Sequence, residues 1–384
     1  MSTIIKYGTS GAWLTYNGNV LNANATTIPP LSYRFRFESP QTASSLTGVG
    51  ARGSWNRISD YIWDFTCDSD RSPWNRNFHY DESAQLPACH LVGASTTATD
   101  VLHQTFYNQD NIKSVYIQEA QSTQAFHGCD GIISFQMEYY GGDSHIQLDS
   151  AETIEFGVFR GTHVVAPNCT SLHIGTLTET EYDDENFSVV GSQYNPCTIV
   201  VDSMPNAVSI ETMCQGGGGI GSIYLGHTDS LENCRHAFAY CTNLTQVHID
   251  DMSNATSTFR MFEYCSSLTL CPAFDLSSCA DMSYMFDSCT RLTACPDFTI
   301  DPAVLHGSGY AVERMYVDCD SLTSGAFDWY YKLTGDTDAY VDTYGHLPPD
   351  PYYQGPFEPS SETSMFEDAY SDEAGWPYIN QNWK

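Results

Sequence analysis

The sequence predicts an α/β solenoid in which each repeating unit is a short strand plus a helical turn. Two observations carry this prediction. An aromatic, cysteine and leucine pattern recurs at a fixed spacing, and within each copy the apolar spacing changes from three or four residues to two. A fixed period of this size is typical of solenoids, whose units bury their apolar sides only against neighbouring units.

The repeat is clearest over residues 238–322, where an aromatic residue, a cysteine and a leucine follow one another at steps of three residues. The first three copies begin 24 residues apart, and the last begins 30 residues after the third. These positions form what we call the repeat ladder: Phe238, Cys241, Leu244, Phe262, Cys265, Leu268, Phe286, Cys289, Leu292, Tyr316, Cys319 and Leu322. Cysteine is small and readily buried, so we expect its ladder positions to point inward and stack.

The two halves of one unit are visible in the third copy. Met282, Met285 and Cys289 recur at steps of three and four residues, which is the spacing of one face of a helical turn. Phe298 and Ile300 then alternate with polar residues, as in a strand. We therefore expect a helical turn and a short strand, joined by polar loops, in each unit.

Residues 261–269 (MFEYCSSLT) and 285–293 (MFDSCTRLT) resemble the repeats of BspA-like leucine-rich-repeat surface proteins. More narrowly, they resemble repeat proteins encoded by phages and prophages of gut Bacteroidales, which often finish on a short Trp-containing tail such as residues 379–384. The match covers roughly residues 230 to 325. The resemblance implies a leucine-rich-repeat-like solenoid that serves binding and display rather than catalysis.

Three regions are expected along the chain. Residues 1–95 carry no repeat and are rich in aromatic residues, so they are interpreted as a mostly β region that caps the solenoid or attaches it to something larger. Residues 96–325 form the solenoid, with degraded copies of the repeat at its start. Residues 326–384 form a C-terminal cap and an aromatic, Pro-rich tail, of which residues 334–384 are expected to dock on folded protein, since exposed aromatic residues gain from a surface.

The charge balance excludes several classes of partner. The chain has 15 Lys and Arg against 47 Asp and Glu, a formal net charge of −32. Nucleic acid needs a basic surface, and anionic membranes repel an acidic one. Residues 1–8 lack the features of a secretory signal, and no segment reaches the length of a membrane span, so synthesis in a cytosol without membrane insertion is expected. The 14 cysteines are then predicted to be buried thiols rather than disulfides.

No stretch of the sequence predicts a catalytic, cofactor or metal site. The glycine run Gly216–Ser222 lacks the Lys of a phosphate loop and precedes a strand-like segment, which favours a turn. Asp64, Asp68 and Asp70 are spaced as in part of a calcium loop, but the loop's Gly and terminal Glu are missing. Histidine pairs at metalloprotease spacing and C-x-x-C pairs are also absent from the sequence.

Tyrosines offer the more useful indication of a binding surface, because solvent-facing aromatic rings stack on sugars and anchor protein interfaces. Two lie just past a repeat strand and three in the tail, and the candidates for a ligand or partner surface are Tyr139, Tyr140, Tyr352, Tyr353 and Tyr370. The alternative is that these tyrosines merely pack the tail onto the repeats.

These observations favour a non-enzymatic virion protein of a gut phage, a fibre or surface-decorating subunit made in the host cytoplasm. Its expected partners are other virion proteins or further copies of itself, in a homo-oligomer that would be a trimer by analogy with viral fibres, and a host-surface glycan or protein. The first alternative is a BspA-like adhesin of the bacterial cell surface. The second is an enzyme that depolymerises surface polysaccharide, although no carboxylate pair can be singled out among 47 acidic residues.

Overall fold

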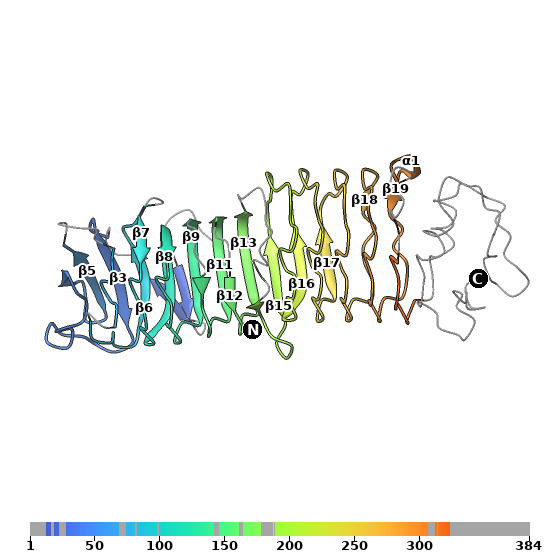
Figure 1. Ribbon diagram of the computed structural model, residues 1–384. Coiled ribbons are helices and arrows are strands. Elements are labelled where there is room, and N and C mark those ends of the chain that lie inside the picture. The colour runs from blue at the N-terminus through green and yellow to red at the C-terminus, as the bar shows by residue number, and fades with distance from the viewer. Residues whose placement is uncertain are drawn as a thin grey trace, which may run out of the picture. The chain divides into compact units, whose positions relative to one another are not determined.

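The structure is a computed structural model that describes residues 13–16, 19–22, 28–68, 74–80, 83–97, 100–141, 146–160, 164–177, 187, 189–305, 312 and 314–322. The chain divides into two compact units, Met1–Thr176 and Leu177–Lys384. In each unit the described residues include stacked turns of a β-solenoid, and one full turn of this backbone is called a coil below (Figure 1). The expected docking segment 334–384 lies outside the described residues.

The expected helical turns are absent from the residues that the structure describes, so the α/β fold class predicted from the sequence is wrong. Helical structure among the described residues is confined to α1 (Pro302–Leu305), and strands and turns make up the rest. The solenoid itself is confirmed, but its units are β coils rather than strand-plus-helix repeats.

The reason lies in the backbone of the segment that mimics a helix. Tyr284 and Ser288 have φ angles of +58° and +59°, in the left-handed region that a right-handed helix excludes. The N–H groups of Phe286 and Ser288 donate to carbonyls of the next coil at 2.8 Å, whereas Met285 and Cys289 bond three residues back. Successive N–H groups thus alternate between an acceptor in their own coil and an acceptor in the next coil. A bent turn of this kind gives the same spacing of apolar residues as a helical turn.

The first unit begins with antiparallel pairing and continues with parallel coils. Its central strands are hydrogen-bonded in the order β4-β5-β3-β6-β8-β9-β11-β13, antiparallel as far as β6 and parallel from β6 through β11. β7 pairs with β8, β10 pairs with β12, and β1 and β2 form a hairpin. The bounds are β1 (Trp13–Tyr16), β2 (Asn19–Asn22), β3 (Ser32–Phe37), β4 (Gly53–Arg57), β5 (Ile62–Cys67), β6 (Cys89–Ala94), β7 (Val101–His103), β8 (Ile112–Thr123), β9 (Ser134–Gly141), β10 (Ile146–Gln147), β11 (Thr153–Arg160), β12 (Val164–Ala166) and β13 (Ser171–Leu177).

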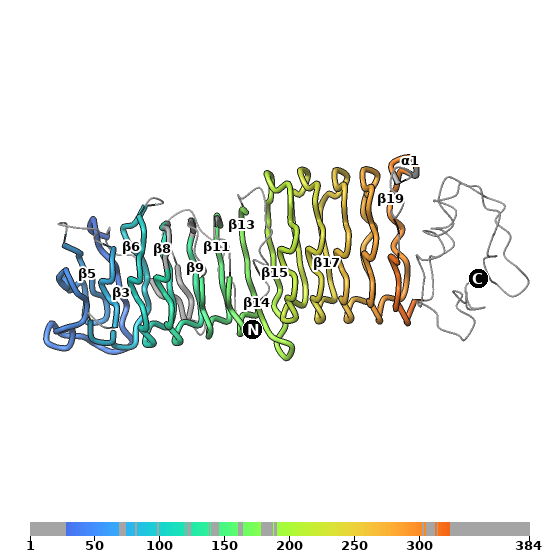
Figure 2. The backbone as a smooth tube through the Cα atoms, in the orientation of Figure 1, coloured from blue at the N-terminus to red at the C-terminus, as the bar shows by residue number. Residues whose placement is uncertain are grey.

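The second unit stacks coils of nearly constant length, which Figure 2 shows as successive loops of backbone between β15 and β19. β15, β16 and β17 pair in parallel, as do the two-residue strands β18 and β19. On another side of the coils, isolated parallel bridges join Ser209 to Asn233, Asn233 to Ser257, and Ser257 to Asp281. The bounds are β14 (Val189–Val190), β15 (Cys197–Val201), β16 (Ile220–Leu225), β17 (Gln246–Ile249), β18 (Asp275–Leu276) and β19 (Thr299–Ile300).

All members of the repeat ladder are buried, and its aromatic rings form one stack. Ring centroids are 5.5 Å apart from Phe238 to Phe262 and from Phe262 to Phe286, and 5.4 Å apart from Phe286 to Tyr316. These spacings are close to the separation of neighbouring strands, so each ring lies directly on the ring of the next coil.

The ladder cysteines make a specific contact in addition to filling space. The Sγ atom of Cys265 donates to the carbonyl oxygen of Phe238 at 3.2 Å, and the Sγ atom of Cys289 donates to that of Phe262 at 3.1 Å. Cys241 and Cys319 make the same bond in their coils, and all 14 cysteines are free thiols. Each of the four ladder thiols therefore ties its coil to the backbone of the preceding one.

The interior of the first unit contains a charged pair that simple alternation does not predict. Arg34 and Asp64, on the adjacent strands β3 and β5, form two hydrogen bonds of 2.7 and 2.9 Å with side chains that are 2% and 0% exposed. Asp64, considered above as part of a calcium loop, is thus committed to Arg34. A paired and hydrogen-bonded charge is the form in which burial is tolerated.

Candidate functional site

Of the five tyrosines predicted as a ligand or partner surface, the structure describes the side chain of Tyr139 alone. Tyr139 lies half-buried on β9 beside Val158 of β11. Tyr140 follows it on the same strand, but its side chain lies outside the described part of the chain, as do Tyr352, Tyr353 and Tyr370. Other aromatic residues occupy the described surface.

Two exposed aromatic pairs lie on the second unit. The rings of Tyr240 and Tyr264 are stacked at 4.9 Å, and those of Tyr224 and His248 at 4.5 Å, each pair joining neighbouring coils. Tyr240 and Tyr264 are 41% and 43% exposed. One face of each ring is covered by its partner, and the four residues remain exposed.

The glycine run predicted as a turn is a turn between two coils. Gly216 has φ +76°, and its N–H donates to the carbonyl of Ala239 at 2.8 Å. A Cβ atom at Gly219 would lie 2.3 Å from the backbone carbon of Gly191, so glycine is required there for close approach. The run is therefore part of the packing of the coils.

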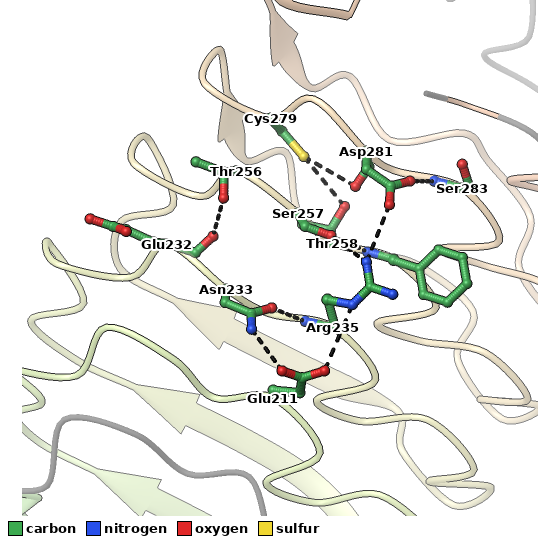
Figure 3. A network of polar contacts seen from close by, with 11 residues as sticks. Glu211, Glu232, Asn233, Arg235, Thr256, Ser257, Thr258, Cys279, Asp281 and Ser283 are labelled. Carbon is green, nitrogen blue, oxygen red and sulfur yellow. Dashed lines mark hydrogen bonds and ion pairs between the residues drawn. The ribbon is translucent and has the colours of Figure 1, made fainter. Parts of the chain in front are cut away.

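A polar network on the second unit connects coils that are far apart in sequence (Figure 3). The guanidinium of Arg235 lies 3.7 Å from Glu211 and 3.4 Å from Asp281, and the amide of Asn233 donates to Glu211 at 2.8 Å. Arg235 also stacks on Phe259, with its Cζ atom 4.4 Å from the ring centroid. These charged and polar groups are paired with one another, which indicates that the network holds neighbouring coils together rather than binding a ligand.

The network belongs to a column that the sequence analysis missed. Asp281 accepts the N–H of Ser283 at 3.0 Å, Asn233 accepts that of Arg235 at 3.2 Å, and Ser257 and Ser209 accept N–H groups in the same way. The recurrence of a polar residue every 24 positions at Ser209, Asn233, Ser257 and Asp281 is the signal that would have revealed it.

A groove of about 500 Å³ on the first unit is the strongest candidate for a ligand site. Its lining is polar and comes from three successive coils: Tyr80, Gln85, Asn108, Asp110, Asn111, Gly128 and Asp130. The N–H of Tyr80 donates to the carbonyl of Tyr107, and the N–H of Asn108 donates to the carbonyl of His127. Tyr80, Asn108 and Gly128 thus take one position in consecutive coils, and Asp110 and Asp130 take another.

Close packing shapes this groove. Asn108 and Gly128 have φ angles of +57° and +69°. A Cβ atom at Gly128 would lie 2.0 Å from Oδ1 of Asn108, so the glycine leaves room for the amide of the preceding coil to lie across it. The rings of His79 and Tyr107, each one residue before a lining residue, stack at 4.7 Å. The volume is within the range of small-ligand sites.

Other kinds of site are not found in the part of the chain that the structure describes. There, no three His, Cys, Asp or Glu side chains are grouped in a way that could hold a metal ion. Within the same residues, no helix has the length and apolar character needed to span a membrane.

The sequence analysis did not identify the groove, because its members are spread over three coils whose repeats are degenerate. The Asn-x-Asp at 108–110 and the Gly-x-Asp at 128–130, 20 residues apart, were the available signal. Comparison with known proteins adds no relative, since no protein-family model matches the chain and no curated protein matches it significantly.

Proposed function

We propose that the chain is a non-enzymatic adhesion and display protein of a phage virion, a fibre or surface-decorating subunit. The groove on the first unit carries this proposal, because it offers a concave polar surface on a scaffold whose coils are tied together by backbone hydrogen bonds. The resemblance of residues 261–269 and 285–293 to phage-encoded repeat proteins supports the virion location. The ligand in this proposal is a host-surface glycan or protein.

Mass spectrometry of virions purified from the source tests the proposal. The chain is expected among the virion proteins, at a copy number consistent with a fibre or a surface subunit. Light scattering of the purified chain tests the accompanying proposal of a homo-oligomer, for which a trimer is expected. If the chain is missing from virions but present on the bacterial surface, the BspA-like adhesin alternative replaces the virion proposal.

The second candidate is a depolymerase, which the paired positions of Asp110 and Asp130 favour. Glycoside hydrolases use two carboxyl groups that flank the bond to be cleaved. Both aspartates are exposed, however, whereas the acid of such an enzyme is held in an apolar environment. Release of reducing ends from host polysaccharide, abolished by Asp110→Asn or Asp130→Asn, would favour the enzyme over the adhesion protein.

A further inference from the structure

We infer that the groove on the first unit binds a short segment of an uncharged, hydroxyl-rich glycan. The inference rests on the proposed adhesion function and names its ligand class. It is argued from the hydrogen-bonding groups that line the groove: Tyr80, Gln85, Asn108, Asp110, Asn111 and Asp130.

The amide side chains of the lining are oriented by the backbone. Nε2 of Gln85 donates to the carbonyl of Asn108 at 2.6 Å, and Nδ2 of Asn111 donates to the carbonyl of Leu86 at 2.8 Å. A carbonyl oxygen can only accept, so these bonds fix which end of each amide is nitrogen. Both amide oxygens remain without a donor from the described residues.

The Gln85 oxygen adds an independent observation. Its Oε1 atom is buried and has no hydrogen-bond partner among the described residues. A buried acceptor without a donor is destabilising, because it has lost its hydrogen bond to water. A hydroxyl group bound in the groove would relieve this cost after a small movement of the side chain.

The two carboxylates extend the row of acceptors. Asp110 and Asp130 occupy the same position in consecutive coils, and both are exposed. Neither side chain has a hydrogen-bond or ion-pair partner in the part of the chain that the structure describes. An ionised carboxylate only accepts hydrogen bonds, and bonds to it are stronger than those between neutral groups.

A sugar suits this arrangement better than an extended peptide. Sugar hydroxyls can each donate to an amide or carboxylate oxygen, whereas a peptide brings as many carbonyl acceptors as N–H donors. Tyr80, 54% exposed at the rim, offers a ring on which the apolar face of a sugar can pack. Asp110 and Asp130 would repel uronate or sialate groups, so the glycan is expected to be uncharged.

The experiment uses the full chain on an array of hexasaccharides of glucose, mannose, xylose and N-acetylglucosamine, with oligogalacturonate as the anionic probe. At least one neutral probe is expected to bind, and oligogalacturonate is not. Isothermal titration with the bound probe should then show at least about tenfold weaker binding for Asp110→Asn/Asp130→Asn, because hydrogen bonds to a carboxylate are stronger than those to the neutral amide oxygen of asparagine. Tyr80→Ala should also weaken binding.

The chain offers matched controls. Asp320 follows Cys319 as Asp130 follows Cys129, and it is exposed outside the groove, so Asp320→Asn removes the same charge and should leave binding unchanged. Tyr194→Ala, at an 89% exposed tyrosine, is the control for Tyr80→Ala. Unfolding midpoints in urea, expected to be equal for all variants, separate lost contacts from lost folding.

Three results would overturn the inference: no neutral probe binds, oligogalacturonate binds as well as the neutral probes, or the double variant binds with the native affinity. Each of these leaves the virion assignment untouched, because mass spectrometry of virions decides that separately. Conversely, a chain absent from virions could still bind a neutral glycan through Asp110 and Asp130.

Discussion

The thiol of each ladder cysteine donates to a backbone carbonyl of the preceding coil. This hydrogen bond determines how much stability is lost when the cysteine is substituted. The carbonyl of Phe238 accepts twice, from the N–H of Cys241 at 3.1 Å and from the Sγ of Cys265 at 3.2 Å. Removing the thiol therefore leaves the carbonyl with one donor.

Cys265→Ser is expected to destabilise the protein by about 1 to 3 kcal/mol, because the shorter C–O bond withdraws a buried hydroxyl from its acceptor. Cys265→Ala should cost less, since it buries no polar group and leaves Phe238 bonded to Cys241. Urea unfolding of both variants beside the native chain measures the difference. If serine proves as stable as alanine, the buried hydroxyl is not short of an acceptor and the expectation is wrong.

His90 predicts a loss of stability in acid. The ring is 3% exposed and bonds through Nδ1 to Ser114 at 2.9 Å, with a Glu38 oxygen 3.6 Å from Nε2. Burial, followed by the charges of Arg36 and Lys113, lowers the pKa of His90 from 6.5 to about 4. The folded state therefore binds fewer protons at His90 than the unfolded state does. The stability gained by burying the neutral ring is fully present above pH 6.5 and is lost as the pH falls towards 4.

The measurement is the free energy of unfolding of the native chain and of His90→Asn between pH 7 and pH 4. The variant should lose less stability over this interval, because asparagine can still bond to Ser114 but does not titrate. Parallel curves for His90→Asn and the native chain would contradict the expectation.

At the scale of elements, the turns are stabilised by side chains that accept an N–H two residues further along the chain. In the column of Ser209, Asn233, Ser257 and Asp281, the aspartate has the additional task of pairing with Arg235. Asp281 therefore both accepts the N–H of its own turn and forms the ion pair that links two coils.

Asp281→Ala is expected to cost about 1 to 2 kcal/mol, as for the loss of a capping side chain. The N–H of Ser283 loses its acceptor, and Arg235 keeps Glu211 as its remaining carboxylate in the network. Urea unfolding checks the value. Asp229→Ala, at an exposed aspartate, is the matched control and should lie within about 0.5 kcal/mol of the native chain.

The turns also show why the sequence predicted the solenoid but not the structure of its units. The period of 24 residues follows directly from buried positions such as Phe262 and Phe286. The helical interpretation failed because apolar steps of three and four residues fit a helix and a bent turn equally well. The deciding features are left-handed φ angles at residues such as Tyr264 and amide partners one coil away, and neither has a local sequence signature.

The groove was hidden for a different reason. Gln85, Asn108 and Asp130 are polar residues of ordinary surface type, and their common property is that the coils bring them together. Where the repeat is regular, as around Cys265, the position of a neighbour can be counted in steps of 24 residues. In the first unit the steps vary, so the register needed to align Tyr80 with Asn108 comes from the structure.

For the whole molecule, burial of the thiols predicts a uniform response to alkylation. Burial raises the pKa of Cys241 from 9.0 to about 12 and raises the pKa values of Cys265, Cys289 and Cys319 well above 9.0. At pH 8 the reactive thiolate of Cys241 is then about one molecule in ten thousand, and its Sγ is also inaccessible.

Iodoacetamide at pH 8 should therefore leave these four thiols unmodified in the native protein and label them all in urea without a reductant. Peptide mass spectrometry after each treatment gives the extent at each site. Labelling that appears only after reduction would show disulfides instead. Rapid labelling of the native chain would show that the ladder is open to solvent.

Because alternate N–H groups bond to the next coil, residues can be added to or removed from the solenoid only as whole coils if these bonds are to be kept. Met261 and Met285 take the same position, and the N–H of Phe238 donates to the carbonyl of Met261 as that of Phe262 does to Met285. Excision of residues 261–284 would put Met285 at the position of Met261, so the N–H of Phe238 would meet an equivalent acceptor, and duplication of these residues would do the same at the new junction. Unequal recombination between neighbouring copies in the gene can therefore lengthen or shorten the protein in whole coils while backbone hydrogen bonds of this kind find equivalent partners.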